Sequence, residues 1–329
     1  MTLTEDQVTV AITIDTEEDD WGSYTEHGAS VGNIAHLPEL QELFDTWGAH
    51  PTYMVNRPPL MHRDSVDVLG ALASNGRVEI GAHCHPWNTP PFGDEGAHRS
   101  MMCLFSESEN RAKIQEIRRC LHAELGVDPH AFKAGRWGFG PTVAGPLADA
   151  GFEIDCSVTP FLDWSSLGGP DYSNAPHQPY RFRANEPFRP DPAGRLLELP
   201  TTIGFLRGDH RRRATVRRWL ERSQFRRLKV VGILDRCGLL SRRWLSPEMS
   251  SGETMIRLAE ACVSSGQSFL HLTFHSCTLL PGATPFVRDK QDRTRFLRSV
   301  SQFLSYCSSS GFTFRTLSEV GRNLHPSNE

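Results

Sequence analysis

The sequence predicts an α/β protein in which parallel strands alternate with helices, and three observations lead to this prediction. First, uncharged runs such as residues 8–14 and 269–274 combine apolar and β-branched side chains, as buried parallel strands do. Second, segments between these runs place apolar residues at helical spacing. Third, the alternation extends over nearly all of the 329 residues, so a parallel barrel or an open parallel sheet is expected.

The individual elements can be assigned in order along the chain. Strands are expected at residues 7–15, 52–55, 78–82, 131–135, 152–156, 196–200, 269–274 and 313–316. Helices are expected at residues 36–47, 64–74, 107–125, 141–150, 252–265 and 290–309. Three prolines exclude regular structure from residues 86–93, and residues 160–195 are rich in Pro, Gly and Asn and are expected to form long loops.

One segment interrupts this alternation and differs sharply in charge. Residues 207–243 hold twelve Arg and one Lys against three acidic residues, a net charge of +10, whereas the remainder carries −14. We expect a single domain over residues 1–329, with a partly helical, Arg-rich insertion at about 205–247. The insertion is either a solvated surface or a lid or docking face for an anionic glycan, a lipid-linked sugar or a membrane.

Other global features narrow the class of protein. The net charge of −4 argues against bulk nucleic-acid binding, and no recognition motif supports it. The eight cysteines show no dense spacing, which favours free thiols in a reducing cytoplasm. We find no signal-peptide pattern and no apolar stretch long enough for a transmembrane segment. Nothing in the sequence indicates the oligomeric state.

Acidic and imidazole side chains gather at three predicted strand ends. Asp15 and Glu17 follow the first strand, His83 and His85 follow the third, and His275 ends the strand at 269–274. Because the carboxyl ends of parallel strands meet at one edge, these groups are expected to converge. Residues two apart on an extended segment point the same way, so each pair could bind one cation.

Less specific interpretations stay open for these residues. Asp15 and Glu17 could belong to a solvated acidic loop, and Glu18 or Asp19 could replace Glu17 as a ligand. Any single histidine could be structural.

Further candidates lie at other strand ends and in neighbouring loops. Arg136 and Asp155 also end predicted strands. A buried Arg needs an acidic partner, and an Arg at this edge could orient a catalytic carboxylate. We therefore assign both residues to the catalytic site. Trp87, Trp137 and Trp164 occur in loops near these ends and could stack on sugar rings, although core packing would explain each equally well.

Taken together, these segments resemble the NodB-type polysaccharide deacetylases, and more closely a cytoplasmic branch with a DTEED first motif. The matching segments are residues 13–19 (TIDTEED), 79–87 (EIGAHCHPW), 133–138 (KAGRWG), 154–158 (IDCSV) and 272–276 (LTFHS). The chain departs from the usual pattern where Thr16 separates Asp15 from Glu17, and where Trp87 stands in place of the second histidine of His-x-x-x-His.

The resemblance implies a distorted (β/α)7 barrel that hydrolyses acetyl groups on sugars. It implies that Asp15 is the general base, that His275 is the general acid and that Arg136 tunes the base. By the same resemblance Glu17, His83 and His85 hold a divalent metal, expected to be Zn²⁺, with Co²⁺ or Ni²⁺ as alternatives.

The expected function is therefore metal-dependent removal of an acetyl group, most readily N-acetyl, from a carbohydrate or a sugar-containing precursor. Two alternatives remain: a small-molecule amidohydrolase on the same barrel, and a non-catalytic carbohydrate-binding relative.

Overall fold

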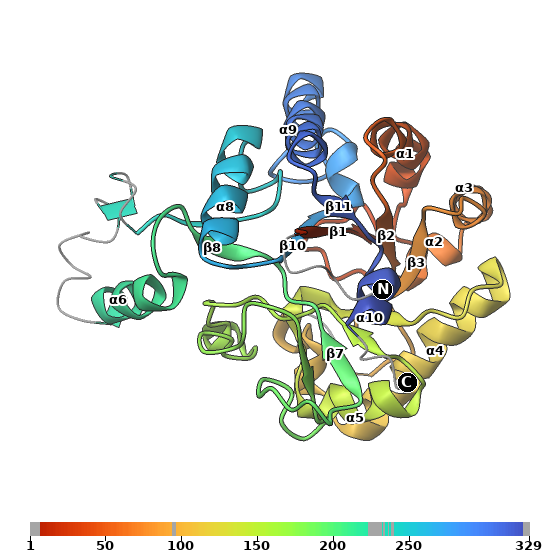
Figure 1. The fold of residues 1–329 in the computed structure, drawn as a ribbon. Helices are drawn as coiled ribbons and strands as arrows, with labels where there is room; N and C mark the ends of the chain where they lie inside the picture. Colours follow the sequence, from red (N-terminus) through yellow and green to blue (C-terminus); the bar gives the residue numbers. More distant parts are fainter. Residues whose placement is uncertain are drawn as a thin grey trace, which may run out of the picture.

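Seven parallel strands form a curled half-barrel sheet in the computed structural model, which describes residues 7–93, 97–222, 232, 234–235, 237 and 240–324 (Figure 1). In spatial order the strands are β10 (Phe269–His275), β1 (Thr9–Thr16), β2 (Pro51–Val55), β3 (Glu79–Cys84), β4 (Ala131–Ala134), β5 (Ile154–Asp155) and β7 (Leu196–Glu198). The chain beyond β7 returns to β10, where the Thr202 amide donates to the His271 carbonyl at 3.1 Å. The predicted α/β barrel class is confirmed.

Four further strands complete the sheets. β6 (Tyr180–Phe182) pairs antiparallel with β7, and β11 (Thr313–Phe314) pairs parallel with β1. β8 (Ile203–Phe205) and β9 (Arg242–Trp244) form a separate antiparallel ribbon. Sequence patterns did not indicate β6, β8 or β9, because these three-residue strands lie in segments read as loops or as part of the Arg-rich insertion, with no longer apolar run to mark them.

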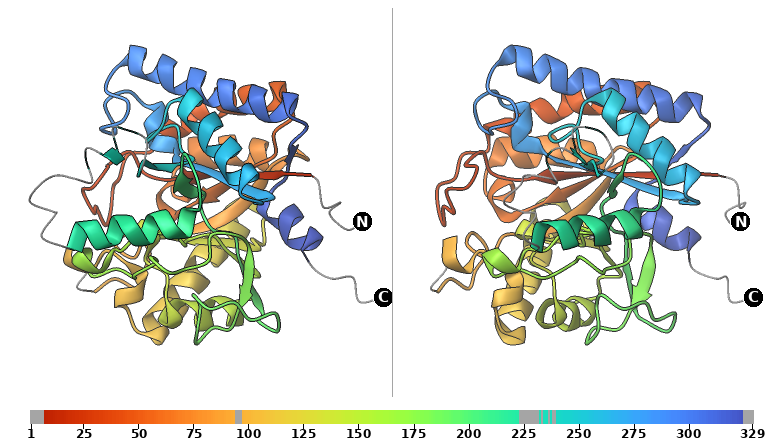
Figure 2. Two further views of the ribbon diagram at one scale, coloured as in Figure 1. Left: turned by 60° about the vertical axis from the view of Figure 1, so that its left-hand side comes forward. Right: turned by 90° about the vertical axis from the view of Figure 1, so that its left-hand side faces the viewer.

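Helices surround the strands, as the two side views of Figure 2 show. They are α1 (Leu37–Thr46), α2 (Arg57–Leu60), α3 (Arg63–Ala73), α4 (Glu107–Leu125), α5 (Pro141–Asp149), α6 (His210–Arg222), α8 (Gly252–Ser264), α9 (Lys290–Ser309) and α10 (Leu317–Asn323). The bounds of α4 follow from its sequence: Ser106 and Glu109 form a capping box, and Gly126 ends the helix at φ 68°. No helix among the described residues combines the length and apolarity needed to cross a bilayer.

Alternation along the strands separates an outer face from an inner one. On β1, Ile12 and Ile14 pack in the large core shared with the surrounding helices, whereas Ala11 belongs to a smaller cluster inside the barrel. Leu317 and Val320 of α10 join this inner cluster and close one end of the barrel (Figure 1). The opposite, carboxyl end is left for the polar side chains.

The Arg-rich segment lies between the two strands of the small ribbon, since β8 precedes it and β9 ends it. Its first part forms α6, in agreement with the predicted partial helix. Much of the remaining segment, residues 223–231, 233, 236 and 238–239, lies outside the described residues. In Figure 1, α6 lies to one side of the barrel, beyond β8.

Candidate metal centre and active site

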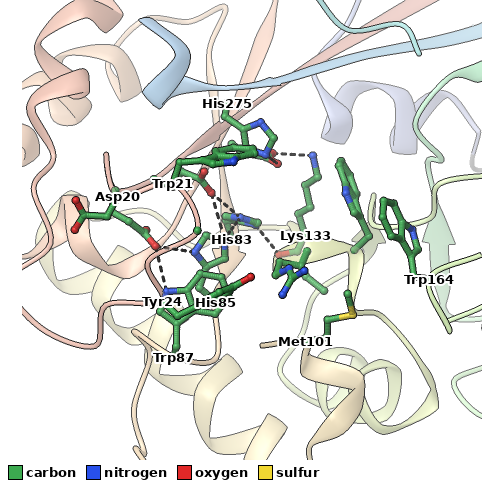
Figure 3. Close-up of a pocket in the computed structure, with 17 residues that line it drawn as sticks. Asp20, Trp21, Tyr24, His83, His85, Trp87, Met101, Lys133, Trp164 and His275 are labelled. Carbon is green, nitrogen blue, oxygen red and sulfur yellow. Dashed lines mark hydrogen bonds and ion pairs between the residues drawn. The ribbon is translucent and has the colours of Figure 1, made fainter. Parts of the chain in front are cut away.

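The polar strand ends of β1, β3, β4 and β10 meet in one pocket of about 280 Å³ (Figure 3). Strand register brings this about, because Asp15 is the pairing partner of His275 across β1 and β10. In the same way His83 pairs with Lys133 across β3 and β4. The predicted convergence of the three strand ends therefore holds in the structure.

Glu17, His83 and His85 form a buried group whose ligand atoms lie within 4.8 Å of one another. Glu17 Oε2 is 3.4 Å from His83 Nε2 and 3.2 Å from His85 Nε2, and the two Nε2 atoms are 2.9 Å apart. All three side chains are at most 7 % exposed. This group could hold a metal ion.

Each imidazole is also held through Nδ1, the ring nitrogen that points away from Glu17. These contacts indicate whether a cation fits between the three side chains. His83 Nδ1 faces the Lys133 carbonyl at 3.0 Å, and His85 Nδ1 faces Glu18 Oε1 at 3.1 Å. Both acceptors require a proton on Nδ1, which leaves the two Nε2 lone pairs and the Glu17 carboxylate facing one another. Such an arrangement needs a cation at its centre, and two imidazole nitrogens on a tetrahedral Zn²⁺ would lie about 3.3 Å apart. The donor set therefore fits a divalent metal.

Electrostatics lead to the same conclusion. Burial opposes protonation of His85, but Glu18 and Glu17 outweigh it and raise the pKa of this imidazole to about 10. The pKa of Glu17 is held well below its ordinary value by His275, His83 and His85, although burial acts in the opposite direction. The two carboxylates therefore favour positive charge at the place where the three side chains meet.

Glu18 and Asp19 support the site from outside. Glu18 Oε1 accepts from Trp87 Nε1 at 3.3 Å and from Asn88 Nδ2 at 3.0 Å, in addition to its contact with His85. Asp19 instead accepts from backbone amides of the following loop, those of Gly32 and Asn33 at 2.7 and 3.0 Å. Carboxylates that orient a ligand histidine are common around metal sites, so Glu18 fixes His85 while Asp19 closes the loop.

The chain after β4 makes room for the His85 ring. A Cβ atom on Gly135 would lie 2.4 Å from His85 Cδ2 and 2.8 Å from the Cys84 carbonyl oxygen, so only glycine fits. The next two residues, Arg136 and Trp137, have φ of 52° and 60°, which non-glycine residues adopt rarely.

Lys133 is the cation that contacts Asp15. Its Nζ donates to Asp15 Oδ1 at 2.7 Å and to Thr273 Oγ1 at 2.8 Å, deep in the pocket. Burial tends to raise the pKa of Asp15, but Lys133, His83 and His275 lower it below its usual value. Asp15 is thus held ionised although it is only 2 % exposed.

This position corrects the role that the resemblance assigned to Arg136. β4 ends at Ala134, and the turn that follows directs Arg136 toward Ser100 and the Tyr24 ring. Lys133, still on the strand, occupies the inward position beside Asp15. In the sequence, Lys133 belongs to a predicted strand and to the segment KAGRWG, but nothing there assigned it a role.

His275 is paired with Glu248, a residue that no sequence pattern indicated as part of the site. Glu248 Oε2 lies 3.0 Å from His275 Nδ1, and Glu248 Oε1 accepts the His275 backbone amide at 2.9 Å and the Thr278 hydroxyl at 2.6 Å. Burial lowers the pKa of His275, but Glu248, Glu17 and Asp15 raise it to about 9. His275 Nε2 faces Asp15 Oδ2 at 3.6 Å, so the imidazole and the carboxylate flank the same space.

Asp155 does not line the pocket. It accepts hydrogen bonds from Ser157, through the amide at 3.0 Å and the hydroxyl at 2.7 Å. Burial raises the pKa of Asp155 and of its neighbour Glu198, so the pair holds a proton. Asp155, which we expected in the catalytic site, is thus turned toward Ser157, and the carboxylate that contacts His275 is Glu248, from another part of the chain.

The three candidate tryptophans all line the pocket but differ in environment. Trp87 stacks on His85 with ring centres 4.1 Å apart and is 6 % exposed, so it mainly supports the ligand. The ring of Trp137 lies 4.3 Å from Lys133 Nζ. Trp164 donates from Nε1 to Thr159 at 2.9 Å, and Figure 3 places it across the pocket from Trp87. Trp21, not singled out from the sequence, packs edge-on against His275 at 4.8 Å.

No protein-family model and no curated protein matches the chain. Solved structures do match. A protein from Mycobacterium smegmatis described as a "putative polysaccharide deacetylase" has a TM-score of 0.57 and 14% identity, over 98% of this chain and 92% of that one. A family 4 acetyl xylan esterase from Clostridium thermocellum, in complex with a cobalt ion, has a TM-score of 0.46 and 13% identity, over 95% and 90%.

A CE4 family pseudoenzyme from Bacillus anthracis also matches, with a TM-score of 0.46 and 9% identity over 96% of this chain and 66% of that one. At identities of 9% to 14% the similarity concerns the fold alone. The conclusion about the fold rests on the first match, whose TM-score is 0.57. The fold class is accordingly the barrel found in that deacetylase-like structure.

Proposed function

We propose that this protein is a metal-dependent hydrolase that removes an acetyl group, most readily N-acetyl, from a sugar or a sugar-containing precursor. One observation carries the proposal: the ionised Asp15 and the protonated His275 flank a space beside the buried Glu17–His83–His85 group. An acid and a base on either side of a cation site suit amide hydrolysis, which needs a proton removed from water and another given to the leaving nitrogen.

Asp15 serves as the general base. The Lys133 ammonium, 2.7 Å away, keeps the carboxylate ionised and holds one oxygen in place. The other oxygen, Oδ2, faces the open side toward His275 and can take the proton of an attacking water. A divalent ion held by Glu17, His83 and His85, proposed to be Zn²⁺, would polarise the acetyl carbonyl.

His275 serves as the general acid. Its Nδ1–H is engaged by Glu248, so a second proton on Nε2 faces the pocket and can pass to the leaving amine nitrogen. Loss of that proton from Nε2 leaves a neutral imidazole whose tautomer Glu248 still fixes. The aromatic walls formed by Trp137 and Trp164 favour a sugar over a small aliphatic amide, because planar rings stack on sugar faces.

Acetate release tests the proposal. Purified protein is incubated with a panel of N-acetylated and O-acetylated sugars and with simple acetamides, with and without a chelator. We expect acetate from at least one N-acetyl sugar, loss of activity with chelator and recovery with added Zn²⁺. Asp15→Ala and His275→Ala should abolish turnover yet keep the metal content of the wild type.

His130→Ala provides a matched control, since the His130 side chain is 56% exposed at the surface. The proposal fails if both active-site variants keep normal activity. Turnover of simple acetamides but of no sugar would favour the amidohydrolase alternative.

Within the proposal, the substrate is a precursor met in the cytoplasm rather than an exported polymer.

A further inference from the structure

We propose that Arg136 binds an anionic group, a phosphate or a carboxylate, carried by the acetylated sugar. This inference rests on the proposed function and adds the chemical class of substrate to it. Arg136 lines the same pocket as Asp15, His83 and His275.

Two other cationic side chains of the pocket, Lys133 and His275, each contact a carboxylate, and Arg136 differs from both. Lys133 is engaged by Asp15 and Thr273. The Arg136 guanidinium, by contrast, donates from Nη1 to the neutral hydroxyl of Ser100, and its carbon lies 5.3 Å from the centre of the Tyr24 ring. Within the described part of the chain, no carboxylate forms an ion pair with this guanidinium. The half-buried guanidinium therefore lines the pocket without an ion-pair partner among the described residues.

The backbone supports a role in binding. Arg136 has φ 52° and ψ 30°, a left-handed conformation that is unfavourable for a long side chain. Trp137, which also lines the pocket, has φ 60°. Strained residues persist where the surrounding structure holds them and cluster at ligand sites. Here the strained turn directs one cation and one aromatic ring into a single cavity.

Guanidinium chemistry defines the ligand. Arginine presents five N–H donors in a planar fork that matches two oxygens of a phosphate or a carboxylate. Ser100 uses one amino group, and the Tyr24 ring contacts the guanidinium while leaving its remaining in-plane donors open to a ligand. A neutral sugar would leave this charge without a counterion. A substrate that carries an anionic group would supply one.

Matched substrate pairs test the inference. N-acetylglucosamine is compared with its 1-phosphate, and with the corresponding N-acetylated uronate, by kcat/KM for acetate release. We expect the wild type to prefer one anionic substrate by about 10- to 100-fold, the range for a hydrogen bond to a charged group. Arg136→Gln should bring that ratio close to one, and Arg136→Lys should keep part of it. A preference for the 1-phosphate identifies the recognised group as a phosphate, and a preference for the uronate identifies it as a carboxylate.

Binding of inorganic phosphate, followed by calorimetry with and without chelator, gives a readout that does not need turnover. Arg136→Gln should weaken this binding by a similar factor if phosphate is the group recognised. Arg183→Gln is the matched control, because Arg183 is 58% exposed and pairs with Asp191 away from the pocket. It should behave as the wild type in both assays.

Several results would overturn the inference. A wild type without preference for either anionic substrate would do so, as would an Arg136→Gln protein that keeps the preference. Equal losses on neutral and anionic substrates would make Arg136 only a structural contact of Ser100 and Tyr24. If no sugar releases acetate, the proposed function fails instead, and calorimetry with phosphate and with the uronate decides the anion site separately.

Discussion

Glu248→Gln isolates the electrostatic part of the His275–Glu248 pair. The carboxylate contacts His275 Nδ1 at 3.0 Å and 3.2 Å, and it raises the imidazole pKa more than any other group. A glutamine oxygen in place of Oε1 can still accept from the His275 amide and from Thr278, so the local structure should persist. The substitution therefore removes charge while it preserves shape.

The magnitude follows from the pKa of His275, which is about 9 in the wild type. A general acid works only while protonated, so activity must fall as pH rises through this pKa. A hydrogen bond to a charged group is worth about 1.5–3 kcal/mol, and one pKa unit corresponds to about 1.4 kcal/mol. The alkaline limb of the profile should thus move to lower pH by about 1 to 2 units.

The assay is the pH dependence of kcat/KM for acetate release by metal-loaded wild type and Glu248→Gln. Glu186→Gln serves as a control, since the Glu186 side chain is 53% exposed. An alkaline limb that stays in place, or moves to higher pH, would refute the assignment of His275 as the acid held protonated by Glu248.

Two further substitutions address the base and the metal site. Lys133→Met should lower the unfolding free energy by about 3–5 kcal/mol in urea titrations at pH 7, because it leaves the buried Asp15 carboxylate unpaired. The acidic limb of the rate profile should also move to higher pH, since the pKa of Asp15 rises. An unchanged limb would show that Lys133 does not keep Asp15 ionised. Gly135→Ala should displace the His85 ring and reduce metal affinity at least about 10-fold, measured by competition with a chromogenic chelator. Gly145→Ala, within α5 where a Cβ meets nothing within 4 Å, should bind metal normally.

Strand ends were the part of the site that the sequence could predict. Asp15, His83 and His275 follow uncharged runs, and parallel register then places them at one edge. Lys133 carried a usable signal as well: a lysine inside a short apolar strand must find a buried acid. That inference would have pointed to Lys133 rather than to Arg136 as the partner of Asp15.

Other features could not be inferred from local patterns. Glu248 lies in an irregular segment after the Arg-rich insertion, and only the tertiary path of that segment brings it to His275. Asp155 ends a strand as expected, yet its side chain is taken up by Ser157. Strand position thus predicts which residues lie near the barrel mouth, but hydrogen-bond partners decide which of them face the pocket.

The most direct test of the account is the location of a metal in the crystallised, zinc-loaded protein. Metal analysis should give one ion per chain, and anomalous diffraction should place it between Glu17, His83 and His85 at about 2.0–2.2 Å from their ligand atoms. His83→Ala should lose this ion. Absence of stoichiometric metal after loading, or an anomalous peak elsewhere in the molecule, would contradict the central claim.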